Sequence, residues 1–359
     1  MLGAVKAVAV VPRQAGSARC LDVEPPSRGR GQIEVRTLAV GVCGTDEEIL
    51  QGLYGAVPAG ADRLILGHEG CGVVEKRAAG FAAGALVVPM VRRPCPERCD
   101  NCAAGEADMC RSGHYRERGI KELPGFMAER FVEAPEYLVP LARPLRPVAM
   151  LLEPLTVVEK GVNQAFRLQR RLRWRPRRAL VLGAGPIGLL GAALTRALGL
   201  ETTLWSRRIG DSRRAWLDRI GAGAVPSSEA PLPELATRLG APDLVLECTG
   251  APPVIREALL SLGANGVLCL LGVSAGEGPV EVPVARWNLQ AVLGNQVVCG
   301  CVNAHRRDFE AGARHMAGWA RRWPGLLEAV VTRQVPPEHV EAAVARQPDD
   351  IKTVVRFAE

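Results

Sequence analysis

Four cysteines in one short polar segment could hold a metal ion together. The segment CPERCDNCAAGEADMC contains them in the spacing C-x3-C-x2-C-x7-C, as Cys95, Cys99, Cys102 and Cys110. Four thiolates this close in sequence suit a tetrahedral zinc ion with Zn–S bonds of about 2.3 Å. The surrounding residues offer little apolar core, so a metal would have to organise the loop. A redox pair is the alternative, but it would use only two of the four cysteines, and we therefore predict a structural zinc site.

A second set of possible metal ligands is spread over three segments. Cys43 lies in GVCGTD, His68 and Glu69 lie in LGHEG, and Glu153 lies in LLEPL. Ionisable groups placed beside apolar chain need partners, because burying them alone costs free energy. One thiolate, one imidazole and one carboxylate leave a coordination position of zinc open, and such a zinc acts as a Lewis acid on a substrate hydroxyl. The set predicts a catalytic zinc, although a lone histidine is more often a satisfied core residue.

A glycine-rich turn, GAGPIG, follows the apolar run RALVL and precedes an apolar helical pattern. In this position Gly183 permits a tight turn, Gly185 lets the backbone approach a pyrophosphate, and Gly188 allows close packing of helix on strand. Pro186 and Ile187 fall in the first helical turn, where the missing N–H of proline does no harm. The free N–H groups of a helix start attract phosphates. The turn predicts dinucleotide binding, and a turn without a ligand is the alternative.

The end of the next strand pattern indicates which dinucleotide binds. About 20 residues after the glycine turn, an NAD-binding fold usually places an acidic residue on the ribose diol. Here the strand ends in Ser206, Arg207 and Arg208. Arginine grips phosphate through a forked set of donors. The segment therefore favours NADP, with NAD still possible if both arginines are merely solvated.

Two patterns of apolar residues along the chain indicate the helices and strands that must position these residues. Up to about residue 150, short apolar runs are broken by Gly, Pro and Asp, which is typical of an irregular strand-rich domain. From about residue 155, apolar strands alternate with helical patterns, which predicts parallel strands joined by crossover helices. An amphipathic helix and a last strand, IKTVVRFA, follow after about residue 303. The fold class predicted is therefore α/β, in two parts.

Composition narrows the class of protein further. The 359 residues fit two domains, and no segment reads as a membrane span or a cleaved leader. Eleven cysteines, an odd number, argue against a secreted disulfide framework, so we expect a cytoplasmic protein. The net charge of +7 includes the arginine-rich stretch 167–178, which could attract phosphates but is more simply a solvated face. No nucleic-acid motif accompanies it, so neither a nucleic-acid nor a membrane partner is expected.

The chain resembles the zinc-dependent medium-chain dehydrogenase/reductases, and within them the glucose dehydrogenases, over essentially its whole length. The resemblance is carried by GVCGTDEEILQGLYGAVPAGADRLILGHEG, ERGIKELPGFMAERFVEAPEYLVPL, EPLTVVEK and CGCVNAHRRDFEAG. It implies a GroES-like, strand-rich catalytic domain at 1–157 and 303–359. It further implies a Rossmann domain, with a doubly wound parallel sheet, at 158–302.

The resemblance also implies roles for particular residues. The catalytic zinc would be held by Cys43, His68 and Glu153, with Glu69 beside the metal directly or through water. Thr45 would pass the substrate proton outward. Together with the four-cysteine site, this makes two zinc ions per chain.

The substrate positions follow in the same way. Glu117 of ERGI and Asn303 of CVN would hold sugar hydroxyls, and Thr45 and Glu153 would also face the substrate. The SRR segment matches the NADP-binding stretch of the branch. Two departures bear on the substrate: Gly294 stands where the branch often has histidine, and Val157 stands where some relatives have a polar residue.

The leading functional hypothesis is a zinc-dependent oxidoreductase that transfers hydride from C1 of a glucose-like aldose to NADP and forms a lactone. The first alternative is an NAD(P)-dependent dehydrogenase of another polyol, cyclitol or biosynthetic sugar alcohol. A non-enzymatic scaffold that kept the fold is the second alternative, and it predicts lost ligands. The segment VLGNQVVCGC could be an edge strand, which in this family pairs across a subunit interface, so a homodimer or homotetramer is expected.

Overall fold

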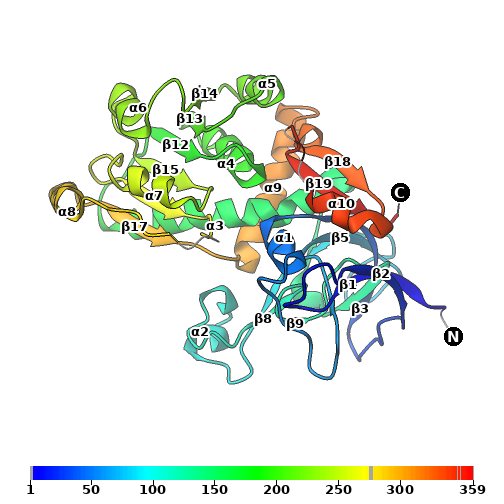
Figure 1. Cartoon of the computed structure of the whole chain (residues 1–359). Helices are drawn as coiled ribbons and strands as arrows, with labels where there is room; N and C mark the ends of the chain where they lie inside the picture. The colour runs from blue at the N-terminus through cyan, green and yellow to red at the C-terminus, as the bar shows by residue number, and fades with distance from the viewer. Residues whose placement is uncertain (1–2, 275–277, 346, 348, 359) are drawn as a thin grey trace. The chain divides into compact units, whose positions relative to one another are not determined.

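The computed structural model describes residues 3–274, 278–345, 347 and 349–358. The chain divides into two compact units, which are considered separately. The first unit comprises Met1–Glu153 and Asn303–Glu359, and the second comprises Pro154–Val302. Figure 1 labels most of their helices and many of their strands.

The first unit is built mainly on antiparallel strands; the pairs β18–β19 and β8–β9 are parallel. Its largest sheet has, among the described residues, seven strands in the order β11-β6-β5-β3-β19-β18, with β10 also paired to β3. These strands are β3 (Ile33–Gly41), β5 (Glu69–Val74), β6 (Leu86–Pro89), β10 (Arg130–Glu133), β11 (Leu138–Pro140), β18 (Val331–Val335) and β19 (Lys352–Arg356). Two smaller sheets have the orders β2-β1-β4 and β7-β8-β9. They contain β1 (Val5–Val10), β2 (Arg19–Val23), β4 (Leu64–Ile65), β7 (Arg92–Arg93), β8 (Arg116–Arg118) and β9 (Glu122–Leu123).

Helices of the first unit are mostly short and lie between the strands. They are α1 (Gly44–Leu50), α2 (Asp100–Ala103), α9 (Arg306–Arg322) and α10 (Val340–Val344), with 3-10 turns η1 (Ala107–Met109), η2 (Pro135–Tyr137), η3 (Arg143–Leu151), η5 (Glu328–Val330) and η6 (Pro337–His339). The core is almost wholly aliphatic, with Phe126 and Phe131 in contact inside it. Burial of this apolar surface is the main stabilising contribution.

The second unit is a parallel sheet. Within the described residues it has six strands in the order β14-β13-β12-β15-β16-β17, and every pair is parallel. The strands are β12 (Arg178–Leu182), β13 (Glu201–Ser206), β14 (Gly223–Pro226), β15 (Leu244–Glu247), β16 (Val267–Leu270) and β17 (Val297–Gly300). In chain order this is 3-2-1-4-5-6, the doubly wound arrangement that creates a ligand site at the carboxyl ends of the strands.

Crossover helices link these parallel strands, as their topology requires. They are α4 (Pro186–Ala197), α5 (Asp211–Ile220), α6 (Leu232–Leu239), α7 (Pro252–Leu259) and α8 (Val284–Leu293). The helix α3 (Leu152–Leu168) and the turn η4 (Gln169–Arg171) precede them in the chain. The predicted α/β class, with a strand-rich part and a Rossmann-type part, is confirmed.

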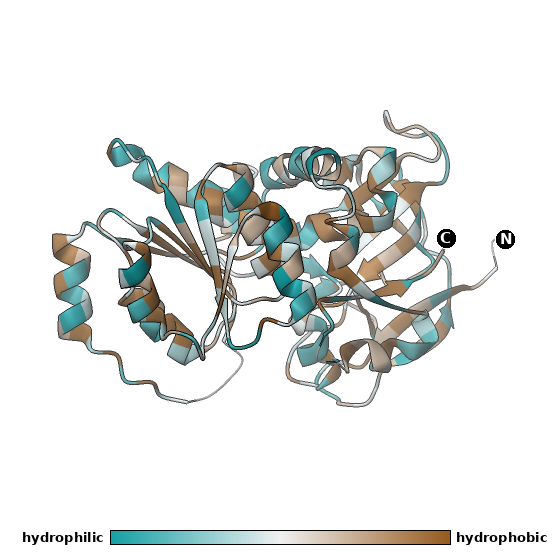
Figure 2. Cartoon of the chain, turned by 90° about the horizontal axis from the view of Figure 1, so that it is seen from above, coloured by the Kyte–Doolittle hydropathy of each residue, from teal (hydrophilic) through white to brown (hydrophobic). Residues whose placement is uncertain are grey.

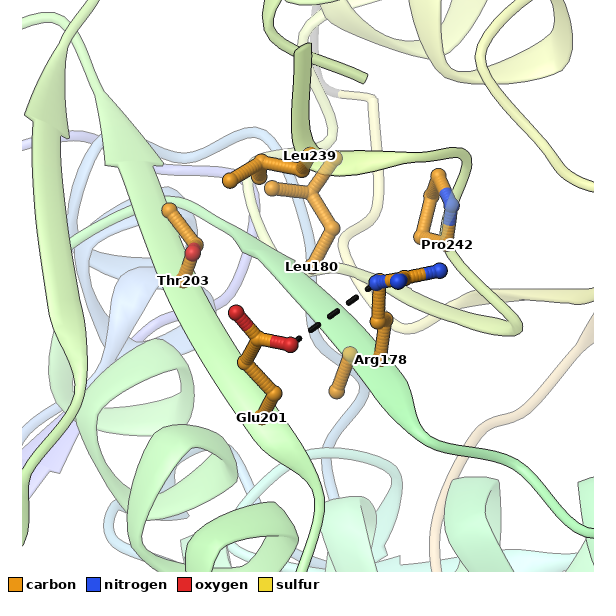
Figure 3. A pocket seen from close by; sticks show the side chains of 7 residues that line it. Arg178, Leu180, Glu201, Thr203, Leu239 and Pro242 are labelled. Carbon is orange, nitrogen blue, oxygen red and sulfur yellow. Dashed lines mark ion pairs between the residues drawn. The ribbon is translucent and has the colours of Figure 1, made fainter. Parts of the chain in front are cut away.

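A small hollow and an arginine-rich segment lie at the surface of the second unit. A small hollow beside β12 and β13 is lined by Leu180, Thr203 and Leu239 and is closed by the ion pair of Arg178 with Glu201 (Figure 3). Its volume of about 10 Å³ is at the lower limit for one water molecule. The arginines at 167, 170, 171, 173, 175 and 177 are exposed, as a solvated segment would be. Among the described residues, no helix is long and apolar enough to cross a membrane.

Candidate active site and metal centres

Cys43, His68 and Glu69 come together in the first unit. Cys43 follows β3 and is the N-cap of α1, and His68 and Glu69 lie where β5 begins. The Sγ atom of Cys43 lies 3.1 Å from Nε2 of His68. The possible ligand atoms of all three residues lie within 4.8 Å of one another. A strand end, a helix start and a second strand therefore converge on one cluster of metal-binding groups.

Asp46 orients two of these groups and was not predicted from the sequence. Its Oδ2 accepts the backbone N–H of Cys43 at 3.0 Å, and its Oδ1 lies 3.6 Å from Nδ1 of His68. The 3.6 Å separation is an ion-pair distance and not a hydrogen bond. A carboxylate in this place, if it closes on the ring, orients a metal-binding histidine so that its other nitrogen faces the metal. Burial opposes the charged imidazole, but the Cys43 thiol and the Asp46 carboxylate together raise the pKa of His68 well above its ordinary value.

Lys352 is the second unpredicted member of the site. This lysine opens β19 and is buried, with Nζ 2.6 Å from Oε1 of Glu69 and 2.9 Å from the carbonyl oxygen of Val42. It also forms an ion pair with Oε2 of Glu69. Removing one member of a buried ion pair typically costs about 3–5 kcal/mol, because the other charge is left uncompensated. Lys352 therefore fixes the position of Glu69 beside Cys43 and His68.

Glu153 lies near this cluster, at the start of α3. Burial is the main factor that raises its pKa, to about 7, and the charge of Glu69 raises it further, whereas His68 and Lys352 oppose the rise. The carboxylate is therefore close enough to His68 and Glu69 to interact with their charges. It is not part of the group of described residues whose ligand atoms lie within 4.8 Å of one another.

The chemistry of this donor set fits a divalent metal. One thiol, one imidazole and two carboxyl groups share a largely buried site whose only described lysine is Lys352. Burial disfavours the charged form of Glu153 and the charge of Glu69 adds to this effect, so both raise the pKa of Glu153. A zinc ion would relieve both costs, because it binds thiolate, neutral imidazole and carboxylate.

The remaining residues that the sequence predicts to contact a substrate lie in the same unit. Thr45, in the first turn of α1, donates its backbone N–H to Sγ of Cys43 at 3.3 Å. Glu117 is buried in β8, and its Oε1 accepts a hydrogen bond from Nδ2 of Asn303 at 3.0 Å. The structure thus brings together Glu117 and Asn303, which are 186 positions apart in the chain.

The four-cysteine segment forms a compact lobe around α2 and η1. All four cysteines are free thiols, and their sulfur atoms lie within 4.8 Å of one another. Backbone N–H groups also point at these sulfurs, from Cys99 to Cys95 at 3.2 Å and from Arg111 to Cys99 at 3.4 Å. The N–H groups of Cys102 and Arg111 lower the pKa of Cys99 to about 6, which favours the thiolate. The lobe therefore fits a closed tetrahedral metal site.

The glycine turn of the second unit has the shape of a phosphate cradle. Gly183 has φ of +106°, a conformation that side chains disfavour, and α4 begins at Pro186 after the N-cap Gly185. A Cβ built on Gly185 would meet nothing within 4 Å, so the backbone there is open. A Cβ on Gly188 would instead clash with the carbonyl oxygen of Gly183. The turn therefore presents free helix N–H groups next to open space, which fits a pyrophosphate.

The SRR segment lies at the carboxyl end of β13, next to the strand that carries the glycine turn. Ser206 is the last residue of the strand, and Arg207 and Arg208 are exposed. Among the described residues, neither guanidinium has a hydrogen bond or ion pair, so both remain available to an anion. Arg213 of α5, which the sequence did not suggest, donates to the carbonyl oxygen of Ala184 at 3.1 Å and braces the turn.

The two departures from the branch pattern also have defined places. Gly294 is the C-cap of α8, and Val157 is half-buried on α3. Of the other histidines, His305 is the N-cap of α9, where its Nδ1 accepts the N–H of Arg307. His114 is exposed and pairs with Glu97, so it is a surface residue.

Comparison with protein families assigns the chain to a class. Residues 29–143 match the model of the alcohol dehydrogenase GroES-like domain, and residues 146–357 match that of the glucose dehydrogenase C-terminus. Joined in one chain, these two regions define a zinc-type medium-chain dehydrogenase/reductase. Within that class, the chain belongs to the glucose dehydrogenase family.

Individual relatives agree with this assignment. A glucose 1-dehydrogenase of Methanocella arvoryzae is 43% identical over 357 residues, which are 98% of this chain and 99% of that one. A second glucose 1-dehydrogenase, from Caldivirga maquilingensis, is 42% identical over the same shares of the two chains.

Solved structures of similar fold include close and distant cases. Haloferax mediterranei glucose dehydrogenase, in complex with NADP, Zn and gluconolactone, matches with a TM-score of 0.90 and 32% identity over 99% of each chain. Galactitol-1-phosphate dehydrogenase of Escherichia coli has a TM-score of 0.79 at 22% identity, over 98% of this chain and 99% of that one. The second likeness concerns the fold alone.

Proposed function

We propose that this chain is a zinc-dependent, NADP-preferring sugar dehydrogenase that oxidises a glucose-like aldose at C1 to the lactone. The observation that carries the proposal is the likeness to Haloferax mediterranei glucose dehydrogenase, whose complex contains NADP, Zn and gluconolactone. The Cys43, His68 and Glu69 cluster and the open turn at Gly185 support it from this chain's own residues. The domain limits at 157/158 and 302/303 are part of the proposal.

The chain's own residues would then have the following tasks. When bound, zinc would supply Lewis acidity at a substrate hydroxyl, and NADP would supply the hydride acceptor. Cys43 and His68 would hold the metal together with Glu153, while Glu69 lies beside it, held by Lys352. Asp46, 3.6 Å behind the ring, would help to keep Nε2 of His68 turned toward Cys43.

Thr45 would accept the proton of the substrate hydroxyl and pass it outward, because its position in the first turn of α1 lies next to Cys43. Glu117 would accept a hydrogen bond from a sugar hydroxyl. In the second unit, the turn from Gly183 to Gly188 would hold the pyrophosphate, and Ser206, Arg207 and Arg208 would surround the 2′-phosphate.

A substrate panel tests this function. The purified protein is assayed for NADP reduction with β-D-glucose, galactose, xylose, an amino-cyclitol and simple primary alcohols, each with and without a metal chelator. We expect a pyranose with an equatorial C1 hydroxyl to have the highest kcat/KM and the chelator to abolish the reaction. Turnover of a cyclitol alone would favour the first alternative, a dehydrogenase of another polyol. No turnover of any substrate would favour a scaffold protein.

Cofactor preference depends on the two exposed arginines. Replacing Arg207 and Arg208 together by alanine should raise KM for NADP by roughly one to two decades, since a charge-assisted contact contributes about 1.5–3 kcal/mol. KM for NAD should change little, because NAD has no 2′-phosphate. The matched control replaces Arg170 and Arg173 by alanine. Both are exposed residues of the second unit, so the control removes the same two positive charges as the Arg207 and Arg208 variant. Equal losses for both cofactors would mean that the arginines do not recognise the 2′-phosphate.

The four-cysteine lobe should behave as a structural site. Elemental analysis should find about two zinc ions per chain in the wild type. Cys102→Ser should retain about one and unfold at a lower temperature, because a structural metal contributes folding free energy. Cys71→Ala, which changes a buried cysteine outside both ligand groups, should keep both ions. A wild type with one zinc, still present in Cys102→Ser, would contradict the assignment.

A homodimer or homotetramer is also part of the proposal. The strand β17 is an unpaired edge of its sheet, and its residue Val298 is 38% exposed. The nearby helix α8 has Leu289, Val292 and Leu293 exposed, and brown and teal residues alternate along it in Figure 2. An open edge strand beside apolar surface favours pairing with another chain.

Sedimentation velocity tests this assembly. The wild type should sediment as a dimer or tetramer, and Val298→Lys should shift it toward the monomer. Leu198→Lys, which changes an exposed leucine at the end of α4, should leave the assembly intact. A monomeric wild type would exclude the proposal. We further propose a cytoplasmic location, which cell fractionation can test.

A further inference from the structure

Glu117 receives its hydrogen bonds on one oxygen only. Arg92 of β7 is its partner across the β7–β8 strand pair, and both residues are buried. Both Nε and Nη2 of Arg92 lie 3.0 Å from Oε1 of Glu117. Nδ2 of Asn303 donates to the same oxygen at 3.0 Å. Two hydrogen bonds, from Nε of Arg92 and Nδ2 of Asn303, therefore use both lone pairs of Oε1, and the ion-pair contact of Nη2 adds to them.

The other carboxylate oxygen, Oε2, is free. No described residue donates a hydrogen bond to it, although the side chain is only 7% exposed. An ionised carboxylate only accepts hydrogen bonds, so the unused Oε2 is suited to a hydrogen-bond donor on a ligand. This asymmetry is a property of the fold itself, because both donors come from other segments of the first unit.

The guanidinium of Arg92 also contacts residues other than Glu117. Its Nη1 donates to the backbone oxygen of Asp108 in the cysteine lobe at 3.3 Å. Its guanidinium lies over the ring of Tyr115, 3.6 Å from the ring centroid. Each nitrogen of the guanidinium thus has one partner and one face lies on Tyr115, which holds Arg92 against Glu117. We therefore expect Arg92 to act on a substrate through Glu117.

Asn303 is similarly occupied. Its Nδ2 donates to Glu117, and its Oδ1 accepts the backbone N–H of Ala304 at 2.8 Å. Its φ of +58° places it in the left-handed region, which asparagine tolerates better than most residues. One N–H of Nδ2 therefore fixes the carboxylate of Glu117, and one lone pair of Oδ1 fixes the start of the following loop.

We propose that Arg92 and Asn303 are positioning residues that saturate Oε1 of Glu117, so that Oε2 alone contacts the substrate and selects a hydroxyl that donates a hydrogen bond. This inference rests on the sugar-oxidising function proposed above. It replaces the expectation that Asn303 holds a sugar hydroxyl directly, and it adds Arg92, which the sequence did not suggest.

The proposal makes a chemical demand on the substrate. The hydroxyl bound by Glu117 must donate, so replacing it by hydrogen or by fluorine should be equally harmful, since fluorine cannot donate. A hydroxyl bound through an amide could instead accept, and fluorine would then preserve part of the contact. Deoxy and deoxyfluoro glucoses, modified at one position at a time, distinguish a hydroxyl that donates from one that accepts, because kcat/KM falls equally for both analogues only if the hydroxyl donates.

The decisive experiment compares two neighbouring arginines. Arg93 lies next to Arg92 in β7 and is also buried. It pairs with Glu133, and its guanidinium lies 3.7 Å from the ring centroid of Tyr137. Arg93→Lys is therefore the matched control. Arg92→Met should lower kcat/KM for glucose about 10- to 100-fold, the effect of an unsatisfied buried group, and reduce the discrimination against the critical deoxy analogue by the same factor. Arg92→Lys should restore part of both, and KM for NADP should not change. Arg93→Lys should leave the discrimination at the wild-type value.

A double-mutant cycle separates positioning from direct contact. In a Glu117→Gln background, Arg92→Lys and Asn303→Ala should have no further effect on the discrimination, because their effects pass through the carboxylate. An Asn303→Ala effect that persists in that background would overturn the role of Asn303. Wild-type discrimination in both Arg92 variants would overturn the role of Arg92. If the wild type oxidises no sugar at all, the proposed function itself fails, which is a different outcome.

Discussion

Replacing Cys43 by serine should abolish turnover while leaving NADP binding intact. The thiol of Cys43 lies 3.1 Å from Nε2 of His68, in a cluster that also contains Glu69. Serine is a poor ligand at neutral pH, so the metal should be lost or loosely held. A Lewis acid contributes several kcal/mol to the transition state, which corresponds to roughly three decades or more in kcat. Steady-state kinetics gives the rate, and fluorescence titration gives the NADP affinity.

The control for this prediction is another cysteine of the first unit. Cys71 is buried in β5, two residues after Glu69, and belongs to neither group of possible metal ligands. Cys71→Ala should lose some stability but keep its metal and most of its activity. Wild-type turnover of a thoroughly demetallated preparation, or of Cys43→Ser itself, would contradict the catalytic metal.

Much of the fold could be predicted because its signals are local. The change from irregular strands to alternating strands and helices predicts the parallel sheet, which the strand order 3-2-1-4-5-6 confirms. The turn at Gly183 and the four-cysteine segment are each contained in fewer than 20 residues. In such short segments the spacing of the residues predicts their geometry, because few backbone conformations can bring the residues together at that spacing.

Parts of the site could not be predicted because their contacts are distant in sequence. Lys352 lies 283 positions from Glu69, and a lysine at the start of a strand is normally at the surface. Arg92 and Arg93 stand side by side and suggest an exposed strand, yet both are buried, each against its own glutamate and tyrosine. Only tertiary structure reveals that these charges are paired.

The cluster around His68 shows how these levels combine. The sequence raises the question of what satisfies a histidine and a glutamate beside apolar chain. The structure answers with Asp46 on His68 and Lys352 on Glu69, two partners from opposite ends of the chain. Nε2 of His68 still lies 3.1 Å from Sγ of Cys43, on the side of the ring away from Asp46. The atoms that could bind a metal therefore stay together, while Asp46 and Lys352 lie behind them.

The substrate prediction concerns Glu117. Glu117→Ala should lower kcat/KM for sugars by about two decades or more, whereas a simple primary alcohol, which makes no contact there, should be affected far less. The alanine variant also leaves Arg92 as an uncompensated buried charge, so it should be destabilised by about 3–5 kcal/mol.

Glu117→Gln separates the loss of substrate recognition from the loss of stability, because the amide keeps the volume and an acceptor oxygen but not the charge. Thermal unfolding measures the stability of both variants, and kinetics on glucose and ethanol measures their selectivity. We expect the glutamine variant to be the more stable of the two and still to lose selectivity for sugars. Equal losses on sugar and alcohol in a folded Glu117→Gln protein would show that Glu117 supports the fold without recognising the substrate.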